Sequence, residues 1–371
     1  MLGLLALPGI RLAAQTSVEP YAVPQLIGDG WEREDPAAAG FDAGRLRPPL
    51  DSLPARERRL HGLIIERHGR LVIELYRPGK DESPYLPFAY RRSFGPTTLH
   101  DLRSVGKSVV GLLFGIARQE GAIGDLSRPV LDFYPEYADL ATPARRAITL
   151  EHLLTMSSGL AWQEGGGFPD DEHRLVWKWS PYRYILEHPV LRAPGSTFSY
   201  HSGGTALLAD IIARSTGMPF KDFARTRLFE PMGIHDWAWT PDMHGRTRVY
   251  DGLRMRPRDL AKIGRMVLDQ GRWKGRQIVP ADWIAVALQP RLGTGFDDVQ
   301  YGYQWWTGTL PWQGRSLRWH AAFGLGNQRL FVVPDLDLCV VVTAGAYGED
   351  LPSAARRINT VFKDIVATLR P

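Results

Sequence analysis

Cysteine is almost missing from this chain, which has one, Cys339, among 371 residues. A single cysteine excludes an internal disulfide, and its position in the apolar run 336–342 predicts a buried strand residue. Cysteine usage therefore gives no information about the compartment in which the protein works.

Long apolar runs are missing as well, and no segment has the length that a membrane span needs. Residues 2–10 form a short apolar run of signal-peptide length, but no basic residue precedes it and Arg11 follows it. We keep two interpretations of residues 1–20. They are the end of a cleaved export signal, which is slightly favoured and implies a periplasmic or secreted protein, or they are an N-terminal arm of a cytoplasmic protein.

Several catalytic and cofactor motifs are also lacking. The ten histidines form no H-E-x-x-H or H-x-H-x-D cluster, which disfavours a metallohydrolase. No G-x-S-x-G is present, which disfavours a Ser-His-Asp α/β-hydrolase, and no Gly-rich strand-to-helix turn favours a nucleotide enzyme. We therefore expect no metal and no cofactor.

A concentrated basic patch is missing too, although the net charge is +5. The arginines are scattered with acidic residues between them, and no zinc-finger, RNP-type or basic-zipper pattern accompanies them. This predicts a solvated surface and no nucleic-acid partner. We also expect no stable membrane insertion, and the sequence does not indicate the oligomeric state.

The composition that is present, 44% hydrophobic and 23% charged, is typical of a globular protein with one large core or two lobes. Residues 63–76 contain two β-prone runs around a turn, and residues 329–343 contain two more. Helical patterns occur in the middle and at the end of the chain, at 104–119, 150–156, 205–215, 257–270 and 353–369.

This order of elements predicts an α+β or α/β protein with two lobes. We expect an antiparallel sheet built from both chain ends and flanked by helices, with a mostly helical lobe inserted between them. The sheet lobe would comprise about 36–100 and 300–371, and the helical lobe and cleft about 101–299, after a leader or arm at 1–35. A cleft between lobes is a common place for a site.

The segment 99–117 is the most informative one. From Val109 onward it is apolar around almost its whole circumference, which predicts a buried helix. Ser104 and Lys107 stand at its N-terminus, and residues three apart share a helix face. A serine hydroxyl needs a base to become a nucleophile, and burial lowers the pKa of a lysine. The S-x-x-K pattern thus indicates a nucleophile with its proton-transfer partner.

The alternative is a helix-capping Ser104 and a surface Lys107. Two observations favour the catalytic interpretation. Lys107 is the only one of seven lysines with a serine three residues before it, and it opens the most apolar helix, where an unpaired lysine would be costly.

Two further segments complete the pattern. Tyr200 lies in the turn-rich loop 194–204, and the small-residue segment 319–328 leads into the C-terminal strands. Alone, such a tyrosine is more often a packing residue and such a segment only a strand edge.

Together, in this order, the three segments resemble the penicillin-recognising serine hydrolases. The similarity is closest to the class C β-lactamase-like group, which includes esterases, D-amino-acid-peptide hydrolases and 6-aminohexanoate-dimer hydrolases. It extends from about residue 36 to the C-terminus and includes residues 148–160 and 252–283. The resemblance implies a two-lobed β-lactamase/DD-peptidase-like fold.

The resemblance also implies roles for individual residues. Ser104 and Lys107 match the nucleophile and its lysine, and Tyr200 matches the tyrosine of Y-x-N, which passes protons between nucleophile, leaving group and water. Counting back from Pro334 without gaps, 319–321 falls on K-T-G. The backbone N–H groups of Ser104 and Ala322 would then form the oxyanion hole.

The departures from the family pattern shape the expected substrate. Ser202 stands where the motif has asparagine, and Trp319 stands where a β-lactamase has a lysine that binds the substrate carboxylate. His320 either replaces that cation in part or caps the strand edge. We therefore expect a serine hydrolase that cleaves esters or amides of small substrates through an acyl-enzyme on Ser104. The alternatives are a β-lactamase or D-amino-acid peptidase, and a non-catalytic binding protein on the same fold.

Residues 162–184 are the expected substrate wall. Asp171 is acidic and Trp177 and Trp179 are aromatic, which would suit a substrate with an amine end. The alternative is a solvated loop with packed tryptophans. Phe323 is a further pocket candidate on the strand segment.

Overall fold

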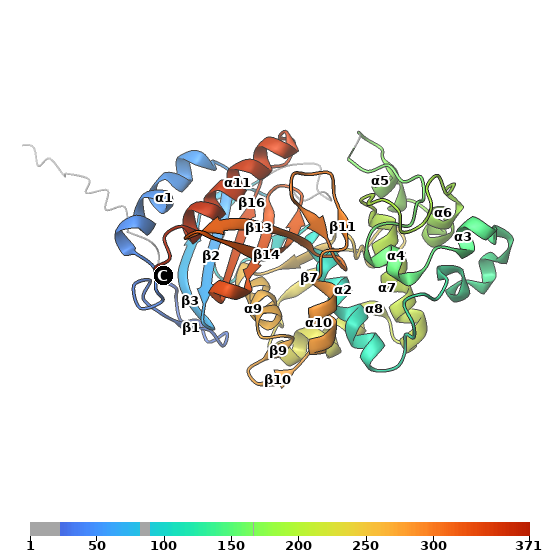
Figure 1. The fold of residues 1–371 in the computed structure, drawn as a ribbon, viewed down its shortest axis with the longest axis horizontal. Helices are drawn as coiled ribbons and strands as arrows, with labels where there is room; N and C mark the ends of the chain where they lie inside the picture. Colours follow the sequence, from blue (N-terminus) through green and yellow to red (C-terminus); the bar gives the residue numbers. More distant parts are fainter. Residues whose placement is uncertain (1–22, 82–89, 166) are drawn as a thin grey trace, which may run out of the picture.

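The computed structural model describes residues 23–81, 90–165 and 167–371, so residues 1–22 of the expected leader or arm at 1–35 lie outside the described residues. A sheet lobe and a helical lobe lie side by side (Figure 1). The predicted two-part architecture is confirmed.

A nine-stranded sheet dominates the sheet lobe. From one edge to the other its strands are β1 (Glu32–Arg33), β3 (Arg70–Tyr76), β2 (Leu60–Arg67), β16 (Leu338–Ala344), β15 (Gln328–Val333), β14 (Arg315–Gly324), β13 (Trp306–Trp312), β12 (Gln300–Tyr301) and β11 (Leu292–Gly293). All neighbours are antiparallel except β1, which runs parallel to β3. The pairing of β2 with β16 joins the two ends of the chain, as the sequence predicts.

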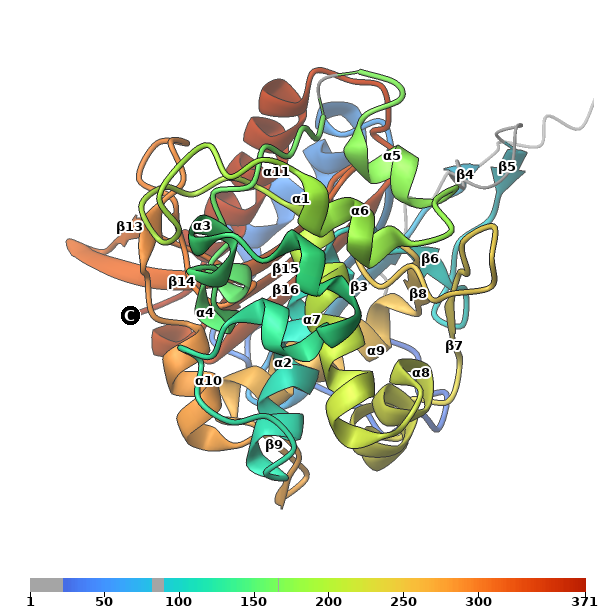
Figure 2. The ribbon, with the colours of Figure 1, turned by 90° about the vertical axis from the view of Figure 1, so that its right-hand side faces the viewer.

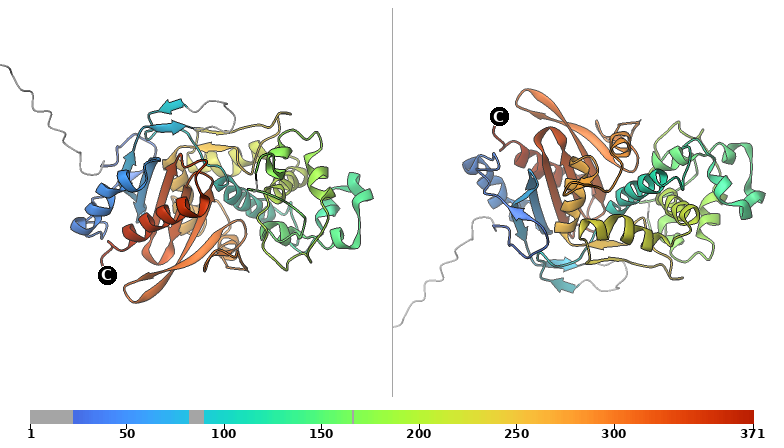
Figure 3. Two further views of the ribbon diagram at one scale, coloured as in Figure 1. Left: turned by 90° about the horizontal axis from the view of Figure 1, so that it is seen from above. Right: turned by 90° about the horizontal axis from the view of Figure 1, so that it is seen from below.

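Helices cover both faces of this sheet (Figure 3). α1 (Ala43–Arg56) and α11 (Leu351–Val366) pack together on one face, and α9 (Pro257–Leu268) packs on the other against β15 and β16. Strands buried on both faces carry nearly continuous apolar runs, which explains the composition of β2 and β16. The middle segment of the chain therefore supplies a helix to the sheet lobe, and the expected lobe limits stay a prediction.

The helical lobe packs against α2 (Val105–Gln119), whose first thirteen residues, Val105–Ala117, are all buried. Figure 2 shows α7 crossing the centre of this lobe. The other helices of the middle and C-terminal segments are α3 (Pro143–Arg146), α4 (Leu150–Leu154), α5 (Asp171–Leu175), α6 (Pro181–Glu187), α7 (Ser202–Thr216), α8 (Phe220–Ala224) and α10 (Ala281–Ala287). α7 ends where Gly217 adopts a φ of 67°, a left-handed conformation that suits glycine.

Short elements complete the fold. The small strands are β4 (Gly79–Asp81) with β5 (Tyr90–Arg92), β6 (His100–Asp101) with β8 (Leu253–Met255) and β7 (Trp237–Trp239), and β9 (Arg272–Trp273) with β10 (Arg276–Gln277). The short helical turns are η1 (Val130–Phe133), η2 (Pro135–Leu140), η3 (Arg225–Phe229), η4 (Glu230–Met232) and η5 (Pro334–Leu336).

The two faces of the sheet belong to separate cores. Successive strand residues point to opposite faces. Along β14, Trp319 and Ala321 therefore join the core under α1 and α11, whereas Ala322 joins the core shared with α2 and α9. Ser104 therefore lies on the same side of the sheet as Ala322, and Trp319 and Ala321 lie on the other side.

Candidate active site

Ser104, at the N-terminus of α2, lines a cavity of about 660 Å³, and we call the part of the cavity next to Ser104 its inner end. Arg103, the residue before Ser104, has a φ of 51° in the left-handed region, which for a residue other than glycine costs about 1–3 kcal/mol. Its guanidinium lies 4.5 Å from the ring centroid of Tyr347. The chain thus turns sharply from β6 into α2 and presents Ser104 at the turn.

Lys107 lies one turn into α2 with 1% of its surface exposed. Its Nζ donates hydrogen bonds to Oγ of Ser104 at 2.7 Å and to the carbonyl oxygen of Tyr250 at 3.0 Å. The helix brings Ser104 and Lys107 together because residues three apart share a face.

Tyr200 lies just before α7, with its ring centroid 4.9 Å from Nζ of Lys107. The ring stacks on Trp306 with 5.8 Å between centroids. Burial raises the pKa of Tyr200, and the charge of Lys107 offsets this only in part. The structure therefore brings together the three residues that the sequence selects as catalytic.

The pKa of Lys107 differs from the sequence expectation. Burial lowers it, but the interactions with Tyr200, Glu164 and Glu172 outweigh burial, so the pKa of Lys107 lies above its ordinary value. Lys107 is an ammonium at neutral pH, which agrees with the hydrogen bond that Nζ donates to Ser104. The expectation was wrong because these neighbours lie far from Lys107 in the sequence.

Glu164 and Glu172 are the residues that sequence reasoning missed. Glu164 accepts hydrogen bonds from the backbone N–H of Ser202 at 2.8 Å, from Oγ of Ser202 at 2.7 Å and from Nε1 of Trp162 at 2.9 Å. Glu172 lines the cavity with Ser104. Nothing in the segment 162–184 separates these two acids from the others, because only the tertiary arrangement turns them toward Lys107.

The two carboxyl groups have opposite pKa shifts. Burial raises the pKa of Glu164, but the charge of Lys107 and the hydrogen bonds from Ser202 and Trp162 outweigh burial and bring it below its ordinary value. Burial and the neighbouring charge of Glu164 raise the pKa of Glu172 far above its ordinary value. Of the two carboxyl groups beside Lys107, Glu164 therefore releases its proton more readily than an ordinary glutamate and Glu172 less readily.

The third segment differs from its sequence assignment. Trp319 faces the core under α1 and α11, packs over Gly308 and is not directed at Ser104. β14 approaches the nucleophile instead at Gly324, where an added Cβ would lie 2.3 Å from the carbonyl oxygen of Leu102. The gap-free count from Pro334 puts the K-T-G glycine at Ala321, three residues before Gly324.

The shift of three residues moves the other positions of the motif. With the glycine at Gly324, the lysine position falls on Ala322, which is fully buried opposite Leu330. On this alignment too, no cation stands at the lysine position. The backbone position after the glycine becomes Leu325, which lines the cavity beside Ser104.

Of three further predicted pocket residues, Trp177 lines the cavity, whereas Trp179 and Phe323 do not. Trp177 lines the cavity, with 48% of its surface exposed. Trp179 is 82% exposed, does not line the cavity and contacts the ring of His244. Phe323 is half-buried behind Tyr200, where its ring stacks on Trp306.

Asp171 and His320 do not belong to the pocket. The carboxylate of Asp171 is buried and accepts hydrogen bonds from the Tyr184 hydroxyl at 2.6 Å and the Gln163 backbone N–H at 2.8 Å. His320 is buried inside the sheet lobe, and burial together with the charge of Arg318 lowers its pKa to about 4. Asp171 is thus occupied in holding its own loop, and His320 is a neutral buried ring rather than a substitute for the lysine.

We call the part of the cavity that is lined by exposed apolar side chains its mouth, and two arginine–aspartate ion pairs involve lining residues. Arg248 forms an ion pair with Asp251, and Asp242 forms one with Arg246. Exposed apolar side chains among the lining residues are Phe168, Trp177, Met243 and Leu325.

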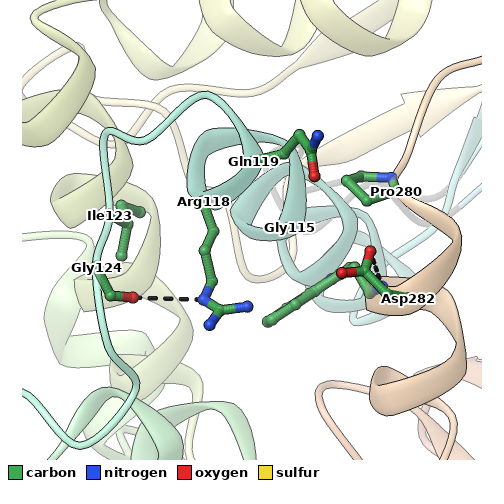
Figure 4. A pocket seen from close by; sticks show the side chains of 8 residues that line it. Gly115, Arg118, Gln119, Ile123, Gly124, Pro280 and Asp282 are labelled. Carbon is green, nitrogen blue, oxygen red and sulfur yellow. Dashed lines mark hydrogen bonds between the residues drawn. The ribbon is translucent and has the colours of Figure 1, made fainter.

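A second pocket, of about 330 Å³, lies at the opposite end of α2 (Figure 4). It lies between the C-terminal turn of α2 and the start of α10, and Arg118 donates there to the carbonyl oxygen of Gly124 at 3.4 Å. Its lining contains no nucleophile beside a base, so it is not the candidate site.

Within residues 23–81, 90–165 and 167–371, no group of three or more His, Cys, Asp or Glu side chains is placed to hold a metal ion. Among the same residues, no helix has the length and apolar character needed to cross a membrane.

Comparisons with known proteins agree with this geometry. The chain is 27% identical over 338 residues to the 6-aminohexanoate-dimer hydrolase of Paenarthrobacter ureafaciens, covering 83% of this chain and 80% of that protein. It is 32% identical over 291 residues to the esterase EstB of Burkholderia gladioli, covering 71% of each chain. Among solved structures, a provisionally assigned 6-aminohexanoate-dimer hydrolase of Bacillus anthracis matches 91% of this chain and 87% of its own with a TM-score of 0.70 at 19% identity, which shows a shared fold.

The beta-lactamase family model matches residues 56–361, which include both lobes and the Ser104, Lys107 and Tyr200 segments. The chain therefore belongs to the beta-lactamase family, and it is a serine hydrolase of the branch that acts on ester or amide bonds.

Proposed function

We propose that Ser104 is the nucleophile of this hydrolase and forms an acyl-enzyme with an ester or amide substrate. The observation that carries the proposal is the 2.7 Å hydrogen bond from Nζ of the buried Lys107 to Oγ of Ser104. An ammonium in contact with Oγ stabilises the negative charge that develops there, and the N-terminus of α2 adds positive potential.

Proton transfer follows from the same contacts. The form of the Lys107–Tyr200 pair that accepts a proton has Lys107 as an ammonium and Tyr200 as a tyrosinate. When Oγ attacks the carbonyl carbon, its proton passes to the Tyr200 oxygen, and the tetrahedral intermediate then expels the alcohol or amine, which takes that proton. Water attacks the acyl-enzyme, gives a proton to the pair, and the collapse of the second intermediate releases the acid and restores Ser104. Because Nζ of Lys107 donates to Oγ, Tyr200 is the better-placed acceptor of the serine proton.

The oxyanion of both intermediates needs two N–H donors. The N–H of Ser104 at the start of α2 is one. For the second donor we favour Leu325 over the predicted Ala322, because Leu325 lines the cavity with Ser104 whereas Ala322 is fully buried within the sheet.

The cavity favours neutral, partly apolar substrates. Its mouth is lined by apolar side chains, its arginine–aspartate charges are paired, and an alanine stands at the lysine position that would bind a carboxylate. The names of two relatives, an esterase and a 6-aminohexanoate-dimer hydrolase, support an ester or amide substrate over a penicillin. The occupied carboxylate of Asp171 weakens the expectation of an amine-ended substrate.

The test compares three substrates, p-nitrophenyl butyrate, nitrocefin and an amino-acid amide, with wild type and Ser104→Ala. We expect turnover of the ester or the amide, little cleavage of nitrocefin and no turnover by Ser104→Ala, which should unfold at the wild-type temperature. Unchanged turnover in Ser104→Ala would exclude Ser104 as nucleophile. Strong nitrocefin cleavage would favour the β-lactamase alternative, and loss of thermal stability with no activity to lose would favour a binding protein.

A further inference from the structure

Glu164 is fixed beside the segment that carries Tyr200. Ser202 stands two residues after Tyr200, and both its N–H and its Oγ donate to Glu164, at 2.8 and 2.7 Å. Trp162 donates a third hydrogen bond at 2.9 Å. Three donors on one carboxylate hold it in place and favour its charged form.

The packing around these donors is tight. The ring of Trp162 stacks on His201, with 4.4 Å between centroids and 20° between planes. A Cβ at Gly203 would lie 3.0 Å from the Trp162 ring and 2.9 Å from Ile185. Glu164, Trp162 and the start of α7 therefore form one rigid unit with Tyr200.

Lys107 receives the charge of Glu164 through space. Its hydrogen-bond partners are Ser104, the carbonyl oxygen of Tyr250 and Tyr200, and none of them is a carboxylate. The other charged or titratable groups around this site are Tyr200, His201, Tyr301, Glu172, Arg248 and Asp251.

Most of these groups carry no net charge toward the site. Arg248 and Asp251 neutralise each other. Burial lowers the pKa of His201 to about 4 and raises the pKa of Tyr301 far above its ordinary value, so both are neutral at pH 7. Among these neighbours Glu164 is left as the negative charge that faces Lys107 and Tyr200.

We propose that Glu164 sets the proton affinity of the Lys107–Tyr200 pair and that Ser202, in the position of the Y-x-N asparagine, holds Glu164 there. The inference rests on the proposed function. A nearby negative charge favours the protonated state of both groups, and two groups that interact titrate as one unit. Glu164 is a positioning residue, because its hydrogen bonds go to Ser202 and Trp162 rather than to the reacting atoms.

Glu172 is the matched control. It lines the cavity, and burial and the charge of Glu164 raise its pKa far above its ordinary value, so Glu172→Gln changes the charge near Lys107 less than Glu164→Gln does. Glu164→Gln removes a negative charge from the same surroundings. The two substitutions change the same chemical group and should have different effects.

The experiment measures kcat/KM for p-nitrophenyl butyrate between pH 5 and 10, with product followed at a wavelength that does not depend on pH. Removing a negative charge lowers the pKa of both partners, so Glu164→Gln should displace the rising limb of the profile, on which the pair loses a proton, to lower pH by about one unit. Glu172→Gln should displace this limb less. Ser202→Ala, which removes one of the three hydrogen bonds to Glu164, should give a smaller displacement in the same direction.

A lower rate without displacement in Glu164→Gln, or an equal displacement in Glu172→Gln, would overturn the proposal. If Glu164→Gln does not fold, an unmoved profile in Ser202→Ala overturns it. Failure of the proposed function gives a different result, namely no Ser104-dependent turnover in the wild type. In that case the pKa of Tyr200 is measured by carbon NMR in the wild type and in Glu164→Gln, with the Tyr200 signal assigned by means of Tyr200→Phe. An equal pKa in the two proteins overturns the proposal.

Discussion

The inner end and the mouth of the cavity are built on different principles. At the inner end, Lys107 and Glu164 are held by hydrogen bonds of 2.7 to 3.0 Å and act on Ser104 and Tyr200 through charge. At the mouth, the four exposed apolar side chains keep between 45% and 75% of their surface accessible. The inner end therefore positions reacting atoms, whereas the mouth offers apolar area without fixed direction. Substitutions at the two ends should change different kinetic constants.

Tyr200→Phe gives the largest effect that we expect at the inner end apart from loss of Ser104. The substitution keeps the ring that stacks on Trp306 and removes the hydroxyl that relays protons. Loss of a positioned acid–base group lowers kcat by roughly 10²- to 10⁴-fold. Steady-state kinetics with the ester should show this loss in kcat with little change in KM. A loss below about fivefold would show that Tyr200 is only a packing residue.

Gly324→Ala tests the contact between β14 and the turn that carries Ser104. The new Cβ would meet the carbonyl oxygen of Leu102 at 2.3 Å, so β14 or the Ser104 turn must move. We expect a lower melting temperature, corresponding to about 1–3 kcal/mol, together with a reduced kcat. Gly293→Ala on exposed β11, where a Cβ meets nothing within 4 Å, is the control and should change neither value. If Gly324→Ala behaves like the control, the reassignment of the third motif is wrong.

The residues around Ser104 and β14 also show what can be predicted from the sequence. Ser104 and Lys107 were found because their contact is set by helix geometry within one turn. The position of the K-T-G motif depends instead on the pairing of β14 with β13 and β15 and on the length of the turn that follows, so counting back from Pro334 does not determine it. The sheet from both chain ends was predictable for a local reason, since its apolar runs and turns are visible in the sequence.

The acidic residues of the helical lobe show more clearly what cannot be predicted from the sequence. Asp171 and Glu164 lie in one loop region and look equivalent in the sequence. In the structure Asp171 is occupied by Tyr184 and Gln163, whereas Glu164 is turned toward Ser202. This difference between Asp171 and Glu164 depends on contacts between residues far apart in the chain, so no local sequence pattern predicts it.

Trp177→Ala should have the smallest of the predicted effects, and it tests whether the substrate makes apolar contact with the mouth of the cavity. Trp177 lines the cavity and Trp179, two residues on, does not, although both are exposed. If an apolar substrate loses contact with roughly 50 Å² of Trp177, binding weakens by about 1.3 kcal/mol, or about tenfold. We expect KM for p-nitrophenyl butyrate to rise by that factor in Trp177→Ala while kcat stays the same, and neither to change in Trp179→Ala. A fall in kcat instead would mean that the mouth helps to position the reacting atoms, and the division between the two ends of the cavity would not hold.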